Sequence, residues 1–463
     1  MNMKKKENYI LHFLKSTGLL FIGVVLPKVV VFLLLSFNTS HISTAEYGYY
    51  DLTINLSTLL SYLLYFDIWI TTMRFLCDPD YENDKDSVIK SGNHVFLFST
   101  LLYIIIGALI CITVKPEYGI DVIILGISQN LSNMYTFSAR GLGKETDFAV
   151  SGILGSIILG ILNIVLISNF HWTLGALYWS AIIGYFAQCA YLEFKTGYLK
   201  TVLSSTLQLS IAKEMFRFTL PMGIGAFAFW VLNSFDKIVL AFVLDLDSGG
   251  IYAVAEKLAG MITFAVQCFT YAWQDIAFRH DSDDEGSFYS LAARLYIVFL
   301  SSGIAVLLPF IRAIFPLIIG EAFSDASLII PVAISAAAIS GLSLFLNNIF
   351  YAIHETGAST KLSLISCVFN LIICYPCIKQ FGMVGASIAI ICSFCFDFFL
   401  KSIFLSKKNQ FRVSWAALIV SIVLILTSCL IYYKGSMIVN CLWLLACLII
   451  LGFCGYKYLV KNK

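Results

Sequence analysis

The chain has 463 residues, of which 59% are hydrophobic and only 13% are charged, and its mean hydropathy is +0.86. Soluble domains carry about 25% charged residues, so this composition excludes a soluble globular protein and indicates a membrane protein. The net charge of +2 gives no indication of nucleic-acid binding, and no nucleic-acid partner is predicted.

Apolar stretches of about 20 residues, long enough to cross a bilayer as helices, recur along the chain between short polar connections. We predict an all-α membrane protein with fourteen transmembrane helices. The predicted spans are residues 17–36, 50–72, 94–114, 120–139, 148–168, 173–192, 216–243, 250–273, 290–310, 327–350, 362–379, 384–405, 413–433 and 437–456. The first span lacks a small-residue cleavage site, so we expect it to be a membrane helix rather than a cleaved signal peptide.

The first helix and the tail before it carry basic residues. The tail from Lys4 to Lys15 is basic with an apolar side, which favours an anchor on anionic lipid. Pro27 lies near the middle of the first span, where a proline kinks a helix and frees carbonyl groups that must face protein or water. We therefore expect the neighbouring Lys28 to face a cavity.

Basic residues alternate between the two sides of the predicted membrane. With the N-terminus in the cytoplasm, 23 of the 30 lysines and arginines fall on the inner side, four fall on the outer side, and Lys28, Lys237 and Lys257 lie within the membrane. Cytoplasmic loops of membrane proteins are enriched in Lys and Arg. The pattern predicts a multi-pass membrane protein with both termini in the cytoplasm.

The sequence contains neither a true phosphate-binding loop nor a cysteine pattern that indicates disulfides or a metal site. The segment from Arg140 to Thr146 lacks the first glycine of a phosphate-binding loop and has Glu145 where that loop needs Ser or Thr. The thirteen cysteines lie almost entirely within the predicted spans, where they act as small apolar residues. We predict no cofactor, no metal site and no enzymatic activity.

An internal repeat has a period of about 200 residues. Gly48-Tyr49-Tyr50 is matched by Gly250-Ile251-Tyr252, and Asn163 is matched by Asn370. The matched residues lie at the same end of helices that run in the same direction, so the two halves are parallel and are expected to form one cavity between them. We predict an N-lobe of residues 1–200, a C-lobe of residues 201–406, and a peripheral C-terminal helix pair of residues 407–463.

Apart from Arg217 at the inner end of the seventh span, the seventh and eighth spans contain four charged residues, Asp236, Lys237, Glu256 and Lys257. Each costs about 2.5–3.5 kcal/mol on insertion scales near the centre of a bilayer, which indicates a functional site or a buried ion pair. From the helix rise, the four lie roughly 10 Å below the outer end of their helices and Lys28 about 14 Å below the outer end of its own.

The motifs around these charges resemble a known family. They are Leu220-Pro221, Asn233-Ser234-x-Asp236-Lys237, Gly250-Ile251-Tyr252-x-x-x-x-Lys257, Trp273-Gln274-x-x-Ala277, Gly320-Glu321-x-x-x-Asp325-Ala326 and Phe381-Gly382-x-x-Gly385-Ala386. In this order and spacing the chain resembles the Wzx-type flippases of the polysaccharide transport family, within the MOP superfamily that also holds the MATE exporters and the lipid II flippases.

The resemblance implies a function and a site. It implies that the protein flips oligosaccharide repeat units on a polyprenyl pyrophosphate carrier from the inner to the outer leaflet, for synthesis of O-antigen lipopolysaccharide, capsule or exopolysaccharide. The two lobes would alternate in opening, and the partners would be the lipid-linked oligosaccharide, membrane lipids and a polysaccharide polymerase. Related flippases carry cavity cations on the first and eighth helices, where this chain has Lys28 and Lys257, and Lys237 is a third candidate for pyrophosphate binding.

Several alternatives stay open. Asp236 with Lys257, or Lys237 with Glu256, would form ion pairs that join the seventh and eighth helices, and Asn233 adds a polar group beside them. Asp67 and Asp397 are candidates for proton coupling, although salt bridges to Arg74 and Lys401 would also explain them.

A cation-coupled exporter of the MATE kind is the alternative function. A membrane glycosyltransferase or polymerase is disfavoured, because the predicted outer loops are short.

Overall fold

A computed structural model describes residues 25–279, 285–353 and 355–461. Among these residues there are helices and turns but no strand, which confirms the expected all-α membrane fold. A helix described from Val25 to His41 comes first. It is followed by α2 (Thr44–Tyr65), α3 (Ile68–Cys77), α4 (Lys85–Thr113), α5 (Gly119–Gly141), α6 (Glu145–Phe170), α7 (Leu174–Thr196), α8 (Tyr198–Ser204), α9 (Leu209–Val243), α10 (Leu246–Arg279), α11 (Glu285–Ile318), α12 (Ala326–Ala352), α13 (Thr356–Asn409), α14 (Trp415–Lys434) and α15 (Met437–Lys461), with short 3-10 turns η1 (Pro79–Tyr81) and η2 (Glu321–Phe323).

Each predicted span overlaps one or two of these helices where the structure describes them, but some bounds differ by up to nine residues, as at the start of α4, and the predicted span 50–72 is divided between α2 and α3. By length and hydropathy, eight described helices can cross a membrane, or nine if the bent pair α2 and α3 counts as one span. Two predicted spans, 362–379 and 384–405, are the two arms of α13. The predicted lipid anchor from Lys4 to Lys15 lies outside the described residues.

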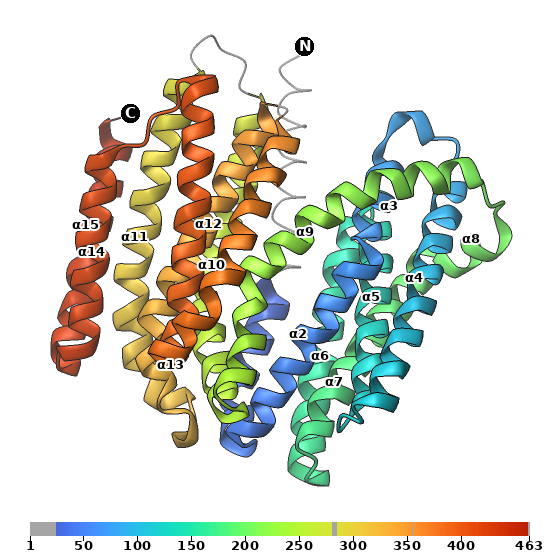
Figure 1. The fold of residues 1–463 in the computed structure, drawn as a ribbon, viewed down its shortest axis with the longest axis horizontal. Helices are drawn as coiled ribbons and strands as arrows, with labels where there is room; N and C mark the ends of the chain where they lie inside the picture. The colour runs from blue at the N-terminus through green and yellow to red at the C-terminus, as the bar shows by residue number, and fades with distance from the viewer. Residues whose placement is uncertain (1–24, 280–284, 354, 462–463) are drawn as a thin grey trace. The chain divides into compact units, whose positions relative to one another are not determined.

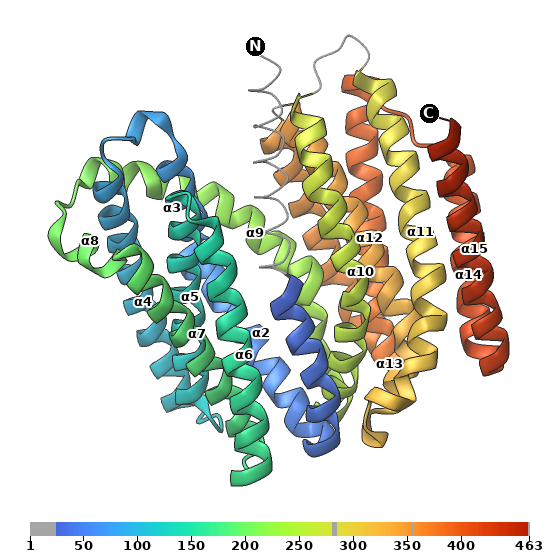
Figure 2. The ribbon, with the colours of Figure 1, turned by 180° about the vertical axis from the view of Figure 1, so that it is seen from behind.

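The chain divides into two compact units. Unit 1 contains residues 1–42 and 50–230, and unit 2 contains residues 43–49 and 231–463, so the chain passes from one to the other within α9. Figures 1 and 2 show both as sets of long helices. The predicted division at residues 200 and 406 remains a prediction.

Unit 1 is built around α5, which packs on α3, α4 and α7, while α6 packs on α7. Its core is rich in aromatic side chains, and the centroid of the Tyr65 ring lies 5.3 Å from that of Phe96 and 6.0 Å from that of Tyr103. The first helix joins this unit beside α6, where the Val30 side chain lies close to Gly160. Lys28 is half-buried on that helix.

A break at Phe66 and Asp67 separates α2 from α3, and the helix direction bends by 50° there. Both residues have left-handed backbone angles, with φ of 48° and 58°. The carbonyl oxygen of Phe66 accepts a hydrogen bond of 2.8 Å from the Thr219 hydroxyl of α9. Backbone groups within a membrane must find partners inside the protein, and Thr219 supplies one for the carbonyl that the break exposes.

Unit 2 has α12 at its centre, in contact with α10, α11 and α13, while α14 and α15 pack chiefly on α11. Aromatic rings fill the space between these helices, with the centroids of Phe269 and Tyr296 4.3 Å apart and those of Trp273 and Phe345 4.8 Å apart. The peripheral position predicted for α14 and α15 fits this packing, since their main neighbour is a single helix.

A glycine turn divides α13 into its two arms. Gly382 has φ 61° and ψ −142°, a conformation that side chains with a Cβ avoid. Gly385 follows so close to the carbonyl of Cys377 that a Cβ there would collide with it. The motif Phe381-Gly382-x-x-Gly385 therefore encodes the reversal between two spanning helices.

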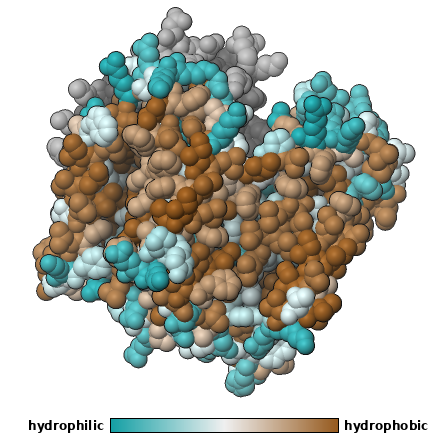
Figure 3. All heavy atoms as spheres, viewed as in Figure 1, coloured by the Kyte–Doolittle hydropathy of each residue, from teal (hydrophilic) through white to brown (hydrophobic). Residues whose placement is uncertain are grey.

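Hydrophobic side chains are exposed along the sides of the helices. On α14, for example, Ile419, Val420 and Leu426 are each about 60% exposed. Figure 3 shows hydrophobic atoms over the middle of the helices and hydrophilic atoms gathered toward their ends. Such faces suit contact with lipid, since soluble monomers rarely expose contiguous apolar surface on this scale.

Candidate functional site

Helices α9 and α10 are joined by a tight turn, in which the Asp245 side chain accepts a hydrogen bond of 2.7 Å from the backbone amide of Ser248. The turn brings two of the predicted charges together. Lys237 of α9 and Glu256 of α10 form an ion pair of 2.7 Å, with side chains 17% and 21% exposed. One of the two ion pairs considered from the sequence is thus present, and it joins the two helices.

Asp236 has a different partner from the one considered. Its carboxylate accepts a hydrogen bond of 2.5 Å from the Tyr252 hydroxyl, and the Ser387 hydroxyl of α13 donates to the same tyrosine oxygen at 3.5 Å. Asp236 is 1% exposed, and its other carboxylate oxygen has no hydrogen-bond donor among the described residues. A buried carboxylate oxygen without a donor is a position that a proton or a cation would satisfy.

Lys257 is held by a neutral aromatic side chain. Its ammonium donates to the hydroxyl of Tyr47 and lies 4.4 Å from the centroid of the Tyr47 ring. Tyr47 is buried, with its ring against the edge of Phe323 at 5.7 Å. In the described part of the chain no carboxylate pairs with Lys257, so its positive charge is not cancelled by a neighbour.

Tyr47 belongs to unit 2 because the first turns of α2 dock on the first turns of α10. The Thr44 hydroxyl donates to Asp247, and the backbones of Gly48 and Gly250 lie so close that a Cβ on either would collide with a carbonyl oxygen of the other helix. These are the two glycines matched by the internal repeat. The contact fixes the position of Tyr47 beside Lys257.

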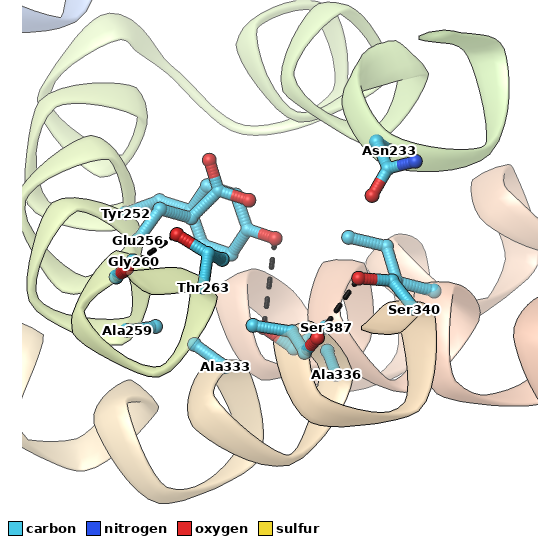
Figure 4. Close-up of a pocket in the computed structure, with 12 residues that line it drawn as sticks. Asn233, Tyr252, Glu256, Ala259, Gly260, Thr263, Ala333, Ala336, Ser340 and Ser387 are labelled. Carbon is cyan, nitrogen blue, oxygen red and sulfur yellow. Dashed lines mark hydrogen bonds between the residues drawn. The ribbon is translucent and has the colours of Figure 1, made fainter. Parts of the chain in front are cut away.

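A cavity of about 160 Å³ lies beside these charges, between α9, α10, α12 and α13. Figure 4 shows Asn233, Tyr252, Glu256, Ser340 and Ser387 at this cavity, which the alanines of α12 line on another side. Its volume is enough for several water molecules, and its polar groups suit water or a small cation. Asn233, Glu256 and Tyr252 thus line the same cavity, and Tyr252 is the hydrogen-bond partner of Asp236.

Lys28 lies in unit 1, whereas Lys237 and Lys257 lie in unit 2. The single charged layer that would join all three lysines therefore remains a prediction.

Asp397 forms a fully buried cluster rather than facing a cavity. Its carboxylate pairs with Lys401 at 2.5 Å, and neither side chain is exposed. Ser363 accepts from Lys401 at 2.9 Å, and Ser343 donates to Asp397. The expected salt bridge to Lys401 is present.

The expected salt bridge between Asp67 and Arg74 is wrong. No such pair occurs in the described residues; the guanidinium of Arg74 lies over the ring of Phe218, 4.1 Å from its centroid. Asp67 is instead at the break before α3, with a left-handed backbone and 8% exposure. Asp67 precedes the first residue of α3 and has a non-helical backbone, so the spacing of two helical turns does not apply to the pair.

The sequence profile of the family described as polysaccharide biosynthesis protein matches residues 13–273, which is more than half of the chain. The chain belongs to the polysaccharide biosynthesis protein family. The match includes the first helix, α9, most of α10 and all four charges of this pair. No curated protein is significantly similar to the chain in sequence.

Solved structures show that this family member has the fold of MOP-superfamily transporters. The lipid II flippase MurJ in an inward closed conformation is 14% identical, with a TM-score of 0.68, covering 96% of this chain and 100% of that one. A multidrug resistance MATE transporter in an inward-facing conformation is 13% identical, with a TM-score of 0.65, covering 84% of this chain and 99% of that one. A MOP-superfamily transporter from Pyrococcus furiosus is 12% identical, with a TM-score of 0.53, covering 85% and 96%.

Sequence reasoning missed two contacts of the site. Tyr252 belongs to the repeat and to the family motif, but neither pattern indicates that its hydroxyl donates to Asp236. Tyr47 opens the second helix among several tyrosines, and nothing in its local sequence indicates a lysine partner 210 residues away. The repeat was the only sequence signal that pointed to this second contact, because it predicts that the starts of α2 and α10 are equivalent.

Proposed function

We propose that this family member is a flippase for oligosaccharide repeat units linked to polyprenyl pyrophosphate, and that it moves them from the inner to the outer leaflet of the bacterial plasma membrane. The family match carries the proposal, because it links a MOP-superfamily fold to polysaccharide synthesis. The structural likeness to a lipid II flippase extends over 96% of the chain, against 84% for the MATE transporter, which further supports it.

Lys257 is the strongest candidate for a pyrophosphate ligand. A phosphate group needs a cation whose charge is not already cancelled, and lysine is a usual point-charge ligand for phosphate. Lys257 contacts a neutral phenol, whereas Lys237 is paired with Glu256. We therefore assign pyrophosphate binding to Lys257 and, because of its position on the first helix, to Lys28. We assign Lys237 mainly to the ion pair that links α9 and α10.

Asp236 is our candidate for the coupling step. It is buried beside the polar cavity, and one of its oxygens has no donor in the described residues. Protonation of that oxygen, or its contact with a cation in the cavity, would remove a buried unpaired charge and so favour one state of unit 2 over another. Alternation between such states moves the sugar and pyrophosphate across while the prenyl tail stays in lipid.

Complementation tests the proposal. A strain that lacks its own repeat-unit flippase is supplied with the wild-type chain, Lys257→Ala, Lys28→Ala or Asp236→Asn, and surface polysaccharide is measured together with the amount of protein in the membrane. We expect wild type to restore the polymer and each variant to lower it at least tenfold. Lys434→Ala, a lysine at the far end of α14, is the control and should behave as wild type.

Two outcomes would contradict the proposal in different ways. Full activity of Lys257→Ala and Lys28→Ala would remove the site assignment while leaving the flippase function. Wild type that restores no polymer in any such strain, but raises tolerance to cationic drugs, would favour the MATE-like exporter.

A further inference from the structure

A large apolar groove lies in unit 2, away from the charged cavity and sharing no residue with it. Its walls are the second arm of α13 and α14, and its floor is formed by α11 and α12. The volume is about 750 Å³, within the range of roughly 300–1,000 Å³ that is usual for small-molecule sites. The groove exists because α14 packs chiefly on α11 and leaves the second arm of α13 uncovered.

The groove has the length of one leaflet. Along α14 its lining runs from Trp415 to Ile425, which at 1.5 Å per residue is about 15 Å. The hydrocarbon core of a bilayer is about 30 Å thick, so this length corresponds to half of it. The lining is almost wholly apolar over this distance, and the hydroxyls of Ser301 and Ser421 bond to each other at 3.0 Å. A single acyl chain fits such a channel.

One end of the groove carries positive charge. Lys407, at the end of α13, and Arg412, in the loop before α14, both line it and are exposed. Neither forms an ion pair with a described residue, in contrast to the adjacent Lys408, which pairs with Glu355. Trp415 beside them is 71% exposed, as expected of an aromatic residue at the level of lipid head groups.

We propose that this groove binds an anionic phospholipid, with one acyl chain between α13 and α14 and the phosphate at Lys407 and Arg412. Basic pockets at the ends of membrane helices attract anionic head groups, and the two cations would add a head-group preference to the apolar contact. The bound lipid fills the gap between α13 and α14 and so joins the C-terminal helix pair to the rest of unit 2. In the proposed topology it belongs to the inner leaflet.

Native mass spectrometry of the purified full-length chain tests the site. Binding of phosphatidylglycerol is compared with that of phosphatidylcholine with the same acyl chains. We expect wild type to bind phosphatidylglycerol about tenfold more tightly, a difference of about 1.4 kcal/mol. The double variant Lys407→Ala with Arg412→Ala should lose this preference, and Lys434→Ala should keep it.

A second pair of variants tests the groove itself. Ile422 lines the groove, whereas Ile419 on the same helix does not, and both are more than half exposed. Ile422→Trp should weaken binding of both lipids at least fivefold, and Ile419→Trp should leave it unchanged. Equal binding of the two lipids by wild type, a preference that survives the double variant, or wild-type binding by folded Ile422→Trp would overturn the proposal. Displacement of bound phosphatidylglycerol by polyprenyl pyrophosphate at lower concentration would assign the groove to the transported carrier instead.

Discussion

Two lysines of α9 and α10 differ in what surrounds their charge. Lys237 is paired with a carboxylate, and Lys257 is placed against a tyrosine hydroxyl and ring. A cation over an aromatic ring gains about 0.5–2 kcal/mol, which holds the ammonium without neutralising it. The arrangement keeps Lys257 fixed in position and available to an anion.

Removal of the Tyr47 hydroxyl should therefore lower transport with little effect on stability. Tyr47→Phe keeps the ring and its packing on Phe323 but removes the acceptor for the ammonium. We expect a three- to tenfold lower initial rate of transport of a lipid-linked oligosaccharide in proteoliposomes. The melting temperature should change by only a few degrees, and an unchanged rate would show that the contact does not position Lys257.

The Asp397–Lys401 pair predicts a large effect on stability. Lys401→Met leaves Asp397 buried without its counter-charge, which costs about 3–5 kcal/mol. The double variant Lys401→Met with Asp397→Leu removes both charges and should recover most of that loss. Thermal unfolding of the purified variants in detergent measures both. If the single and double variants were equally unstable, loss of packing rather than an unpaired charge would be the cause.

At the scale of elements, the contact between α2 and α10 depends on two glycines. A Cβ at Gly250 would meet the carbonyl of Thr44, whereas the nearest atom to a Cβ at Gly249 is 3.8 Å away. Gly250→Ala should thus separate the helices and displace Tyr47 from Lys257, with at least a tenfold loss of surface polysaccharide in complementation. Gly249→Ala is the matched control and should be close to wild type; equal effects would contradict a specific role for the contact.

The helices could be predicted from the sequence, whereas the break between α2 and α3 and the contacts between distant side chains could not. A run of 20 apolar residues is a strong signal for a spanning helix, and the apolar runs predicted both arms of α13, on either side of the turn at Gly382. No glycine or proline marks the break at Phe66 in the sequence. The exposed carbonyl of Phe66 accepts its hydrogen bond from Thr219, more than 150 residues away. Partners such as Tyr47 and Lys257 depend on tertiary packing, which a single sequence does not encode locally.

At the scale of the whole molecule, the distribution of basic residues predicts the orientation in the membrane. Alkaline phosphatase fused after Lys434 should be active, because that loop is predicted to face outward, and a fusion after Lys463 should be inactive. A fluorescent protein that folds only in the cytoplasm should give the opposite pattern at these two sites. Activity of both phosphatase fusions would mean that α15 does not cross the membrane.

The buried cluster at Asp397 also bears on how the protein enters the membrane during synthesis. Asp397 and Lys401 lie one helical turn apart on the same arm of α13. Each charge alone would cost about 2.5–3.5 kcal/mol on insertion, but a pair at this spacing can neutralise itself within a single helix. The segment can therefore leave the translocon as a neutral unit before any neighbouring helix has arrived, and Ser343 and Ser363 need only complete the cluster after assembly.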